Sequence, residues 1–390
     1  MELLRLKDIG EIYDGPHATP KRISTGDLHF LNISGLQNGR LDLSTADRIS
    51  PSDFETWTRR VQPRRDDLLF SYETRIGEAA LMPEGISAAL GRRMALLRPD
   101  NNMVNPRYLL YFWLSPRWQA FLQERTLYGA TVNRIPIGDM PNWPIALPPL
   151  TEQVKVSGVL GSIDDKIAAN TRAINSSTAL AAKIVERGMQ SNNVRLGDVA
   201  RITMGTSPKG EYLKEEVGGL PFYQGVRDFG ELTPQKRVFT ENPVREAETG
   251  DILFAVRAPV GAVNVASEPT AIGRGLAAIR GSANHVALFY FLRAHPEIWN
   301  THQDNGTVFA SINNTDLSNA PIPEIEMDQS QLNLLTGLHN QALVLTKQNL
   351  ILAKTRDELL PHLMSGKITV KEAQQVTAAG VDIASEENEA

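Results

Sequence analysis

Two long stretches of the chain carry apolar side chains at intervals of seven residues, and no proline interrupts either stretch before Pro361. A seven-residue apolar repeat is the seam of a coiled coil. The pattern therefore predicts two long spacer helices, over residues 151–193 and 327–370, that pair with each other. The residues predicted to line the seam are Leu160, Ile163, Ile167 and Ile174 in the first helix and Leu338, Leu345, Leu352 and Leu359 in the second.

Polar residues interrupt this seam at three positions, Asn170, Gln341 and Gln348. A polar side chain in such a place fixes the register of a helix pair at a cost in stability. Asp328 and Gln331 have the spacing of a capping box and predict where the second helix begins. Two ordinary amphipathic helices, each docked on its own domain, would show a similar pattern, so the pairing is a hypothesis at this point.

The segment ahead of the first long helix mixes short strand-like runs with a small helical patch. Residues 28–33 are apolar enough for a strand, and residues 105–114 have a helical pattern that starts at a proline. A proline-rich stop at residues 147–149 separates this segment from the helix. The mixture predicts a domain of both helices and strands over residues 1–150.

The segment ahead of the second long helix repeats the first. Five blocks recur in the same order, while the distance between the copies drifts from 190 to 177 residues. The blocks are 5–15 with 195–205, 67–77 with 251–261, 91–98 with 273–280, 111–112 with 290–291, and 135–145 with 312–322. We therefore predict an α+β fold with two tandem mixed α/β domains, 1–150 and 194–326, each followed by a long helix. Pairing of the helices as an antiparallel coiled coil would give the chain an internal pseudo-two-fold axis.

Composition narrows the class of protein. The 390 residues include no cysteine, which excludes disulfides and cysteine-ligated zinc or iron–sulfur sites. No uncharged apolar run is long enough for a membrane helix, and the first residues lack the apolar core of a signal peptide, so we expect a cytoplasmic protein. Residues 371–390 hold five acidic side chains against Lys371 and predict a disordered acidic tail.

The total charge argues against a protein that holds nucleic acid by electrostatics alone, because Lys and Arg number 40 and Asp and Glu number 45, a net charge of −5. In residues 1–150, however, 16 of the 18 basic residues are arginine, whose planar fork pairs with guanine edges and phosphates. Arg92 and Arg274 follow a glycine at the same place in both copies, which favours a shared role. The arginine pairs at 59–60 and 64–65 fit surface ion pairs with nearby carboxylates equally well.

Familiar catalytic motifs do not occur. The seven histidines form no His-Glu-x-x-His pattern, and no Gly-rich loop ends in Gly-Lys-Ser/Thr. The glycines at 273 and 275 lack the third glycine of a dinucleotide site. We therefore expect a binding protein that is no enzyme and has no metal or cofactor of its own.

Several phrases of the sequence together resemble the specificity (S) subunits of type I restriction–modification systems, the HsdS family. They are the domain starts at 5–10 and 195–200, the apolar runs at 66–70 and 250–254, the helix entries at 147–153 and 322–325, and the closing segment at 356–368. The resemblance implies two target-recognition domains, each reading one half of a bipartite, asymmetric DNA site.

The resemblance also implies partners, which would bind at the paired helices and their seam residues. Double-stranded DNA would be bound together with two methyltransferase (M) subunits, which bring S-adenosylmethionine and methylate adenine at N6. Restriction (R) subunits, up to two, would add a motor-nuclease that uses ATP and Mg. The alternative is a standalone bivalent DNA-binding or scaffold protein without an enzyme partner.

Polar side chains in and around the Gly- and Pro-rich loops are the candidate DNA contacts, since arginine suits guanine, and asparagine or glutamine suits adenine. In the first domain the candidates are Thr19, Lys21, Arg22, Tyr72, Arg75, Arg92, Asn133 and Arg134. In the second domain they are Thr206, Lys209, Tyr223, Gln224, Arg227, Arg257, Arg274 and Asn313.

Overall fold

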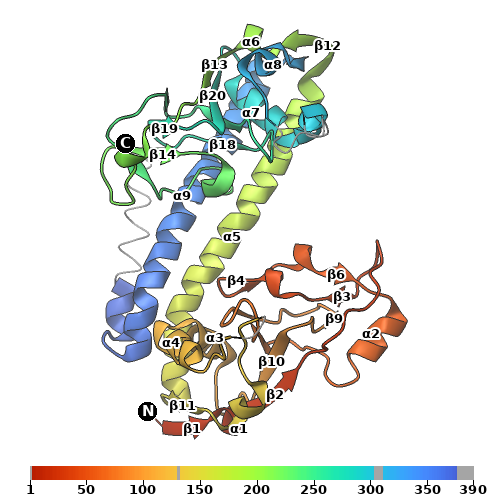
Figure 1. Ribbon diagram of the computed structural model, residues 1–390, viewed down its shortest axis with the longest axis vertical. Helices are drawn as coiled ribbons and strands as arrows, with labels where there is room; N and C mark the ends of the chain where they lie inside the picture. Colours follow the sequence, from red (N-terminus) through yellow and green to blue (C-terminus); the bar gives the residue numbers. More distant parts are fainter. Residues whose placement is uncertain (1, 130–131, 303–310, 376–390) are drawn as a thin grey trace. The chain divides into compact units, whose positions relative to one another are not determined.

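A computed structural model describes residues 2–129, 132–302 and 311–375 (Figure 1). The chain forms two compact units, and each combines one mixed domain with a length of both long helices. The first unit holds the described residues up to Lys166 together with those from Leu352 onward, and the second unit holds Ile167–Ile351. The C-terminal helix thus supplies part of the first unit.

A four-stranded antiparallel sheet lies at the centre of the first unit, in the order β2-β10-β7-β8. The strands are β2 (Gly10–Asp14), β10 (Met94–Pro99), β7 (Leu68–Ser71) and β8 (Ala79–Leu81). Every residue of β7 is buried, in keeping with its apolar run. The ring of Phe70 packs 4.6 Å from that of Trp113 on helix α3 (Pro106–Leu114), so this helix covers one face of the sheet.

Side-chain caps begin the helices of this domain. Asn105 accepts the backbone N–H of Tyr108 at 2.9 Å, and a proline follows it at the first position of α3. Ser115 accepts the N–H of Trp118 at 3.3 Å and begins α4 (Pro116–Glu124) in the same way. The helical patch predicted at residues 105–114 is confirmed.

Three smaller sheets, β6-β3-β9, β4-β5 and β1-β11, complete the first unit. Their strands are β1 (Glu2–Arg5), β3 (His29–Phe30), β4 (Leu36–Gln37), β5 (Arg40–Leu41), β6 (Asp47–Arg48), β9 (Ala88–Ala89) and β11 (Pro144–Leu147). Short helices join them: α1 (Leu6–Ile9), η1 (Ile33–Gly35), η2 (Leu43–Thr45), α2 (Pro51–Trp57) and η3 (Ile137–Asn142). The strand predicted over 28–33 covers only β3, because Asn32 accepts the N–H of Ser34 and begins η1 instead.

The second unit repeats this plan around a sheet of order β13-β20-β17-β18. Its strands are β13 (Ala200–Met204), β20 (Leu276–Gly281), β17 (Ile252–Ala255) and β18 (Val263–Val265). A second sheet contains β15 (Phe239–Thr240), β14 (Leu220–Tyr223), β19 (Thr270–Ile272) and β16 (Glu246–Ala247). The helices are α6 (Leu196–Val199), η4 (Gly210–Tyr212), η5 (Val226–Asp228), α7 (His285–Ala294), η6 (Pro296–His302) and α8 (Asn314–Asn319).

One ion pair occurs in both units at matching places. The carboxylate of Asp67 accepts Nε and Nη2 of Arg98 at 2.9 and 2.7 Å, and Asp251 accepts Nε of Arg280. Both carboxylates are buried, and each also accepts a backbone N–H from three residues earlier at 2.8 Å. The repeat seen in the sequence therefore extends to side-chain contacts.

The two long helices, α5 (Leu150–Gly188) and α9 (Gln329–Ser365), pack against each other. In the first unit, Arg356 of α9 contacts Asp164 of α5 at 2.8 Å. In the second unit, Asn170 of α5 donates to Gln348 of α9 at 2.8 Å. Residue numbers rise along α5 as they fall along α9, so the helices run antiparallel. The paired arrangement, and not two separately docked helices, is the one that forms.

The predicted seam is largely buried. Leu160, Ile163, Ile167, Ile174, Leu352 and Leu359 are buried, and Leu338 and Leu345 are half-buried against the core of the second unit. The predicted polar position Asn170 is also buried, and its amide donates to both Gln348 and Asn349. The prediction is wrong for Gln341, whose side chain is exposed because the adjacent Ala342 occupies the seam.

The first spacer helix is shorter than predicted. It ends at Gly188 and not at residue 193, and the chain continues as strand β12 (Met189–Arg195), paired with β21 (Pro321–Ile325). The carbonyl of Gly188 accepts the N–H of Glu326 at 3.0 Å. A Cβ at Gly188 would lie 2.7 Å from the carbonyl oxygen of Glu326, so this close backbone approach both requires glycine and ends the helix.

The second spacer helix also differs at its ends. It begins behind the predicted capping box, in which Asp328 and Gln331 exchange bonds of 2.9 and 2.8 Å. It passes through Pro361 and ends at Ser365, because Gly366 adopts a left-handed φ of +71°. Residues 370–375 are helical, so the disorder predicted for 371–390 is wrong at 371–375, and residues 376–390 lie outside the described residues.

Candidate nucleic-acid interface

Several loops of the first unit leave the central sheet at one edge. Because neighbouring strands are antiparallel, β2 and β7 end where β10 and β8 begin. The N–H of Gly15 donates to the carbonyl of Met94 at 2.9 Å, and the N–H of Tyr72 donates to that of Arg93 at 3.3 Å. The N–H of Ile135 donates to the Tyr72 carbonyl at 2.8 Å. We call these loops, residues 15–22, 72–78, 90–93 and 132–135, the first loop end.

The first loop end gathers the candidate contacts of the first domain. Thr19, Lys21, Arg22, Arg92, Asn133 and Arg134 are exposed there, and Arg75 is half-exposed. Arg22 lies 3.0 Å from Asp47, and Arg75 lies 3.3 Å from Glu78. Such surface ion pairs are weak, so a phosphate or a base edge can replace them at little cost.

The second unit builds the same arrangement from residues 205–209, 256–262, 273–275 and 311–313, which we call the second loop end. The N–H of Gly205 donates to the carbonyl of Leu276 at 2.9 Å. The N–H of Val256 donates to Gly275, and that of Ile312 donates to Val256, both at 2.9 Å. These bonds match those of the first loop end one for one. The antiparallel sheet order is the same, so the loops again leave at a single edge.

Candidate contacts also meet at the second loop end. Thr206, Lys209, Arg257, Arg274 and Asn313 are exposed, as are Gln224 and Arg227 after β14. Ser207 joins two of them, because its hydroxyl donates to Oε1 of Gln224 at 2.7 Å and accepts the N–H of Arg274 at 3.2 Å. The side-chain oxygen of Asn313 already accepts the N–H of Asp316 at 2.9 Å, which leaves its amide N–H groups as the donors on offer.

Glycines at both loop ends allow this close packing. A Cβ at Gly15 would lie 2.5 Å from the carbonyl oxygen of Met94, and one at Gly205 would lie 2.2 Å from that of Gly273. A Cβ at Gly91 would lie only 1.7 Å from the carbonyl oxygen of Leu31. Gly15, Gly91 and Gly205 are therefore places where two backbones touch, and Arg92 and Arg274, which follow Gly91 and Gly273, are exposed.

Two predicted contacts need correction. Tyr72 is 4% exposed and Tyr223 is 2% exposed, so neither ring presents surface to DNA. Burial raises the pKa of both hydroxyls above the usual value for tyrosine. Each tyrosine lies at the end of a strand, where alternation turns its side chain to the core. Sequence alone places these residues beside the loops but does not show which way they point.

An exposed apolar pair beside the first loop end was missed from the sequence. Leu127 is 50% exposed and Tyr128 is 68% exposed. The N–H of Leu127 donates to the carbonyl of Arg134 at 2.9 Å, which places the pair next to Asn133. The signal in the sequence was an apolar pair that lies between the end of a helix at Glu124 and the candidate contacts Asn133 and Arg134.

The ion pairs also separate structural from available arginines. Arg98 and Arg280 hold the buried aspartates at the strand end of the sheet away from the loops. Arg65 pairs with Asp66 and Glu84, as the ion-pair interpretation of residues 64–65 expected. Arg92 and Arg274 are exposed at the loop ends, so the shared role suggested by their repeated position is compatible with ligand contact.

No group of three or more His, Asp or Glu side chains within residues 2–129, 132–302 and 311–375 is arranged to hold a metal ion. Among the same residues, no helix has the length and apolar character needed to cross a membrane. The exposed side chains of both loop ends are polar and include arginines. These residue types suit hydrogen bonding to base edges and phosphates.

A family model described as "Type I restriction modification DNA specificity domain" matches the chain twice, at residues 1–177 and 189–352. The chain belongs to this family. Each matched segment of the specificity-domain family contains one complete loop end. Membership confirms the resemblance read from the sequence, including its two-copy organisation.

Curated relatives of the specificity-domain family match along nearly the whole chain. The specificity subunit of the type I restriction enzyme MjaX from Methanocaldococcus jannaschii is 29% identical over 410 residues, which cover 95% of this chain and 94% of the relative. The MjaIX specificity subunit of the same organism is 23% identical over 420 residues, with the same coverage.

A solved member of the specificity-subunit family shares the fold. The S subunit of a type I restriction–modification system from M. genitalium is 16% identical, with a TM-score of 0.59 over 93% of this chain and 95% of that one. The tandem α+β domains and paired long helices are thus the architecture of an S subunit.

Proposed function

We propose that the chain reads a bipartite, asymmetric site on double-stranded DNA, one target-recognition domain per half-site. In this role it positions two M subunits for adenine N6 methylation and, where present, two R subunits for restriction. The observation that carries the proposal is the loop end built twice on one backbone plan, with exposed polar side chains that differ between the copies.

The backbone plan and the side chains have different roles in this proposal. Matching hydrogen bonds and glycines hold the loops of each unit at one sheet edge. The exposed residues on that shared frame are not the same. Asn133 and Arg134 precede the repeated Ile135 in the first unit, whereas Asn313 follows the matching Ile312 in the second. Since direct readout depends on which donors and acceptors face the base edges, two different sets imply two different half-sites.

The net charge of −5 fits a subunit that leaves much of the phosphate contact to its partners. We expect the isolated chain to bind DNA weakly, and its complex with M subunits to bind tightly. S-adenosylmethionine then belongs to the M subunits, and ATP and Mg belong to the R subunits.

The test is to co-express the chain with the M subunit of the same restriction–modification system and to map methylated adenines across the host genome. One bipartite motif with a methylated adenine in each half is the expected result. A stable complex without methylation would favour the standalone scaffold, and failure to form a complex would remove the partner role.

Single substitutions make the same experiment sharper. Arg92→Ala is expected to relax or abolish recognition in one half of the motif and Arg274→Ala in the other, at a cost of about 1–3 kcal/mol each. Arg59→Ala, which removes an exposed arginine outside the loop ends, is the matched control and should leave the motif unchanged. Loss of the same half by both loop-end variants would contradict one domain per half-site.

A further inference from the structure

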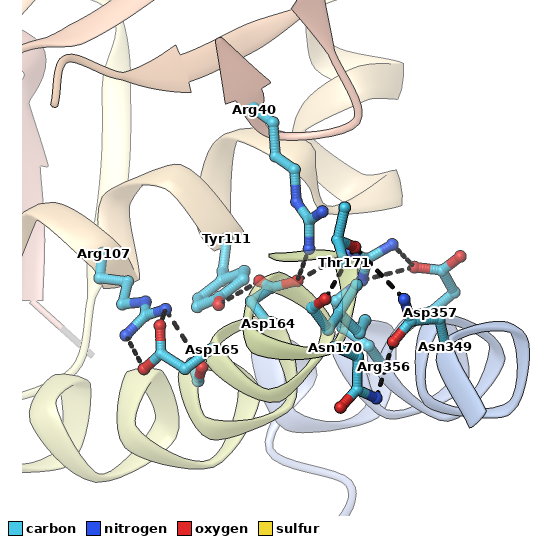
Figure 2. A network of polar contacts seen from close by, with 12 residues as sticks. Arg40, Arg107, Tyr111, Asp164, Asp165, Asn170, Thr171, Asn349, Arg356 and Asp357 are labelled. Carbon is cyan, nitrogen blue, oxygen red and sulfur yellow. Dashed lines mark hydrogen bonds and ion pairs between the residues drawn. The ribbon is translucent and has the colours of Figure 1, made fainter. Parts of the chain in front are cut away.

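Asp164 on α5 is the centre of a polar cluster in the first unit that recognition of DNA does not require (Figure 2). Its Oδ2 accepts the hydroxyl of Tyr111 on α3 at 2.6 Å. Its Oδ1 accepts Nη1 of Arg356 on α9 at 2.8 Å and lies 3.8 Å from Nη2 of Arg40 on β5. One carboxylate therefore joins both long helices to two separate elements of the recognition domain.

The cluster is shielded enough for these contacts to matter. The side chain of Asp164 is 20% exposed and that of Arg356 is 16% exposed. Tyr111 is buried, and its pKa is raised above the usual value by burial and by the neighbouring carboxylate. A buried hydroxyl group that loses its hydrogen-bond acceptor is destabilising, because its desolvation is no longer offset. The Tyr111 contact alone therefore makes the position of α3 depend on Asp164.

Arg40 connects the cluster toward the first loop end. It belongs to the β4-β5 hairpin, whose turn residue Gly39 approaches Leu114 of α3 so closely that a Cβ would lie 2.9 Å from its Cδ1. The hairpin follows Ser34, whose carbonyl accepts Nε2 of Gln37 at 3.1 Å and Nη1 of Arg75 at 3.3 Å. A path of contacts therefore runs from α9 through Asp164, Arg40 and the β4-β5 hairpin to Arg75, a candidate DNA contact.

In the second unit, the matching tyrosine meets a histidine on α9 instead of an aspartate on α5. Tyr290 occupies the repeated position of Tyr111, and its hydroxyl lies 3.3 Å from Nδ1 of His339 on α9. Burial lowers the pKa of His339 to about 4, so this imidazole is neutral at neutral pH. At the matching place in the first unit, the charged carboxylate of Asp164 accepts hydrogen bonds from Tyr111 and Arg356 and forms an ion pair with Arg40.

We propose that Asp164 is a positioning residue that fixes the first recognition domain on its own stretch of the helix pair, and that this restraint makes the gap between the half-sites stringent. The second part rests on the proposed function, because a gap has meaning only for a bipartite reader. Asp164 touches no DNA in this role. It acts through Tyr111, Arg40 and Arg356.

Asp164→Asn is the informative variant, because it keeps the shape of the side chain and removes the charge. Asp357→Asn is the matched control, since the Asp357 carboxylate also accepts Arg356, at 2.7 Å, but is 64% exposed. Asp164→Glu retains a carboxylate for the same donors and serves as the conservative rescue. Cooperative thermal unfolding of each variant would confirm that all three are folded.

Hydrogen exchange in the complete chain tests the restraint without DNA. We expect the amides of residues 36–41 and 107–114 to exchange about tenfold faster in Asp164→Asn, and at the unchanged rate in Asp357→Asn and in α7 of the second unit. Asp164→Glu should recover most of the protection. Unchanged exchange in Asp164→Asn would overturn the positioning role, whatever the protein does with DNA.

Methylation by the complex with M subunits tests the consequence. Duplexes carry the mapped site with its own gap or with one base pair added or removed. We expect Asp164→Asn to methylate the natural gap and to lose about tenfold of the preference for it, while Asp357→Asn keeps that preference. Faster exchange with an unchanged gap preference would refute the link to spacing. Absence of any bipartite motif in the unchanged chain would refute the proposed function, and the exchange result would still decide the restraint.

Discussion

Replacing Gly91 by alanine should open the first loop end. The new Cβ would stand 1.7 Å from the carbonyl oxygen of Leu31, and real Cβ atoms essentially never approach closer than 3.0 Å. The two backbones must therefore separate by the difference, about 1.3 Å. Neither backbone is free to move, because the N–H of Leu31 donates to Ala89 at 3.0 Å and that of Met94 donates to Gly91 at 3.3 Å.

The cost follows from those bonds. Losing two backbone hydrogen bonds near a buried strand costs about 1–2 kcal/mol each, and alanine returns at most about 1 kcal/mol by restricting the unfolded chain. We expect a net local destabilisation of about 1–3 kcal/mol. Gly138→Ala is the control in the same unit, because no atom lies within 4 Å of its new Cβ, and it should be neutral or slightly stabilising.

Hydrogen exchange of residues 89–94 measures this cost. Gly91→Ala should exchange there about 5- to 150-fold faster than the unchanged chain, and Gly138→Ala at the same rate as the unchanged chain. The complex carrying Gly91→Ala should also lose recognition of one half-site, since Arg92 is displaced with the loop. Equal protection in the two alanine variants would refute the reasoning from backbone contact.

Three further predictions concern other parts of the chain. Burial, with a contribution from His285, lowers the pKa of His339 to about 4. The unfolded chain therefore takes up a proton at His339 below pH 6.5 while the folded chain does not, and the free energy of unfolding of the second unit should fall by about 3 kcal/mol as the pH drops from 6.5 toward 4. His339→Gln should flatten this pH dependence in urea unfolding. Asn170→Leu removes a buried amide from the helix pair, so the free energy of unfolding should stay equal or rise. The variant should also allow other registers of the two helices. Spin labels on cysteines introduced into α5 and α9 would detect a second register as a second distance. Tyr128→Ala should weaken DNA binding by the complex about fivefold, because it removes an exposed ring beside Asn133 that can make apolar contact with base edges or sugars, and unchanged anisotropy titrations would remove this residue from the interface.

Much of the architecture could be predicted from periodicity and repetition. The seven-residue apolar spacing predicted two long helices because a helical face repeats at that interval whatever surrounds it. Asp328 and Gln331 predicted their own capping box, since capping depends on residues three apart. The ordered repeats predicted two equivalent domains, and the glycines among them marked the places where backbones touch.

Other features depend on contacts between distant residues. Sequence predicted helix through residue 193, but Gly188 meets Glu326, and that pairing turns the chain into strand β12. Tyr72 and Tyr223 stand beside candidate contacts in sequence, yet their rings enter the core. The sequence places a polar residue, Asn170, in the seam, but only the structure shows that its amide donates to Gln348 and Asn349 on the other helix.

The sequence by itself determined the kind of protein: two copies of a recognition-domain plan, long paired helices, and no recognisable catalytic motif. These properties depend on local spacing and on repetition, which the chain carries wherever it folds. The tertiary structure alone decided which polar residues meet at the loop ends, which arginines are held by buried aspartates, and that Asp164 joins α3, β5 and α9. Those outcomes need residues up to 192 positions apart to come within hydrogen-bond distance, and no local pattern encodes that encounter.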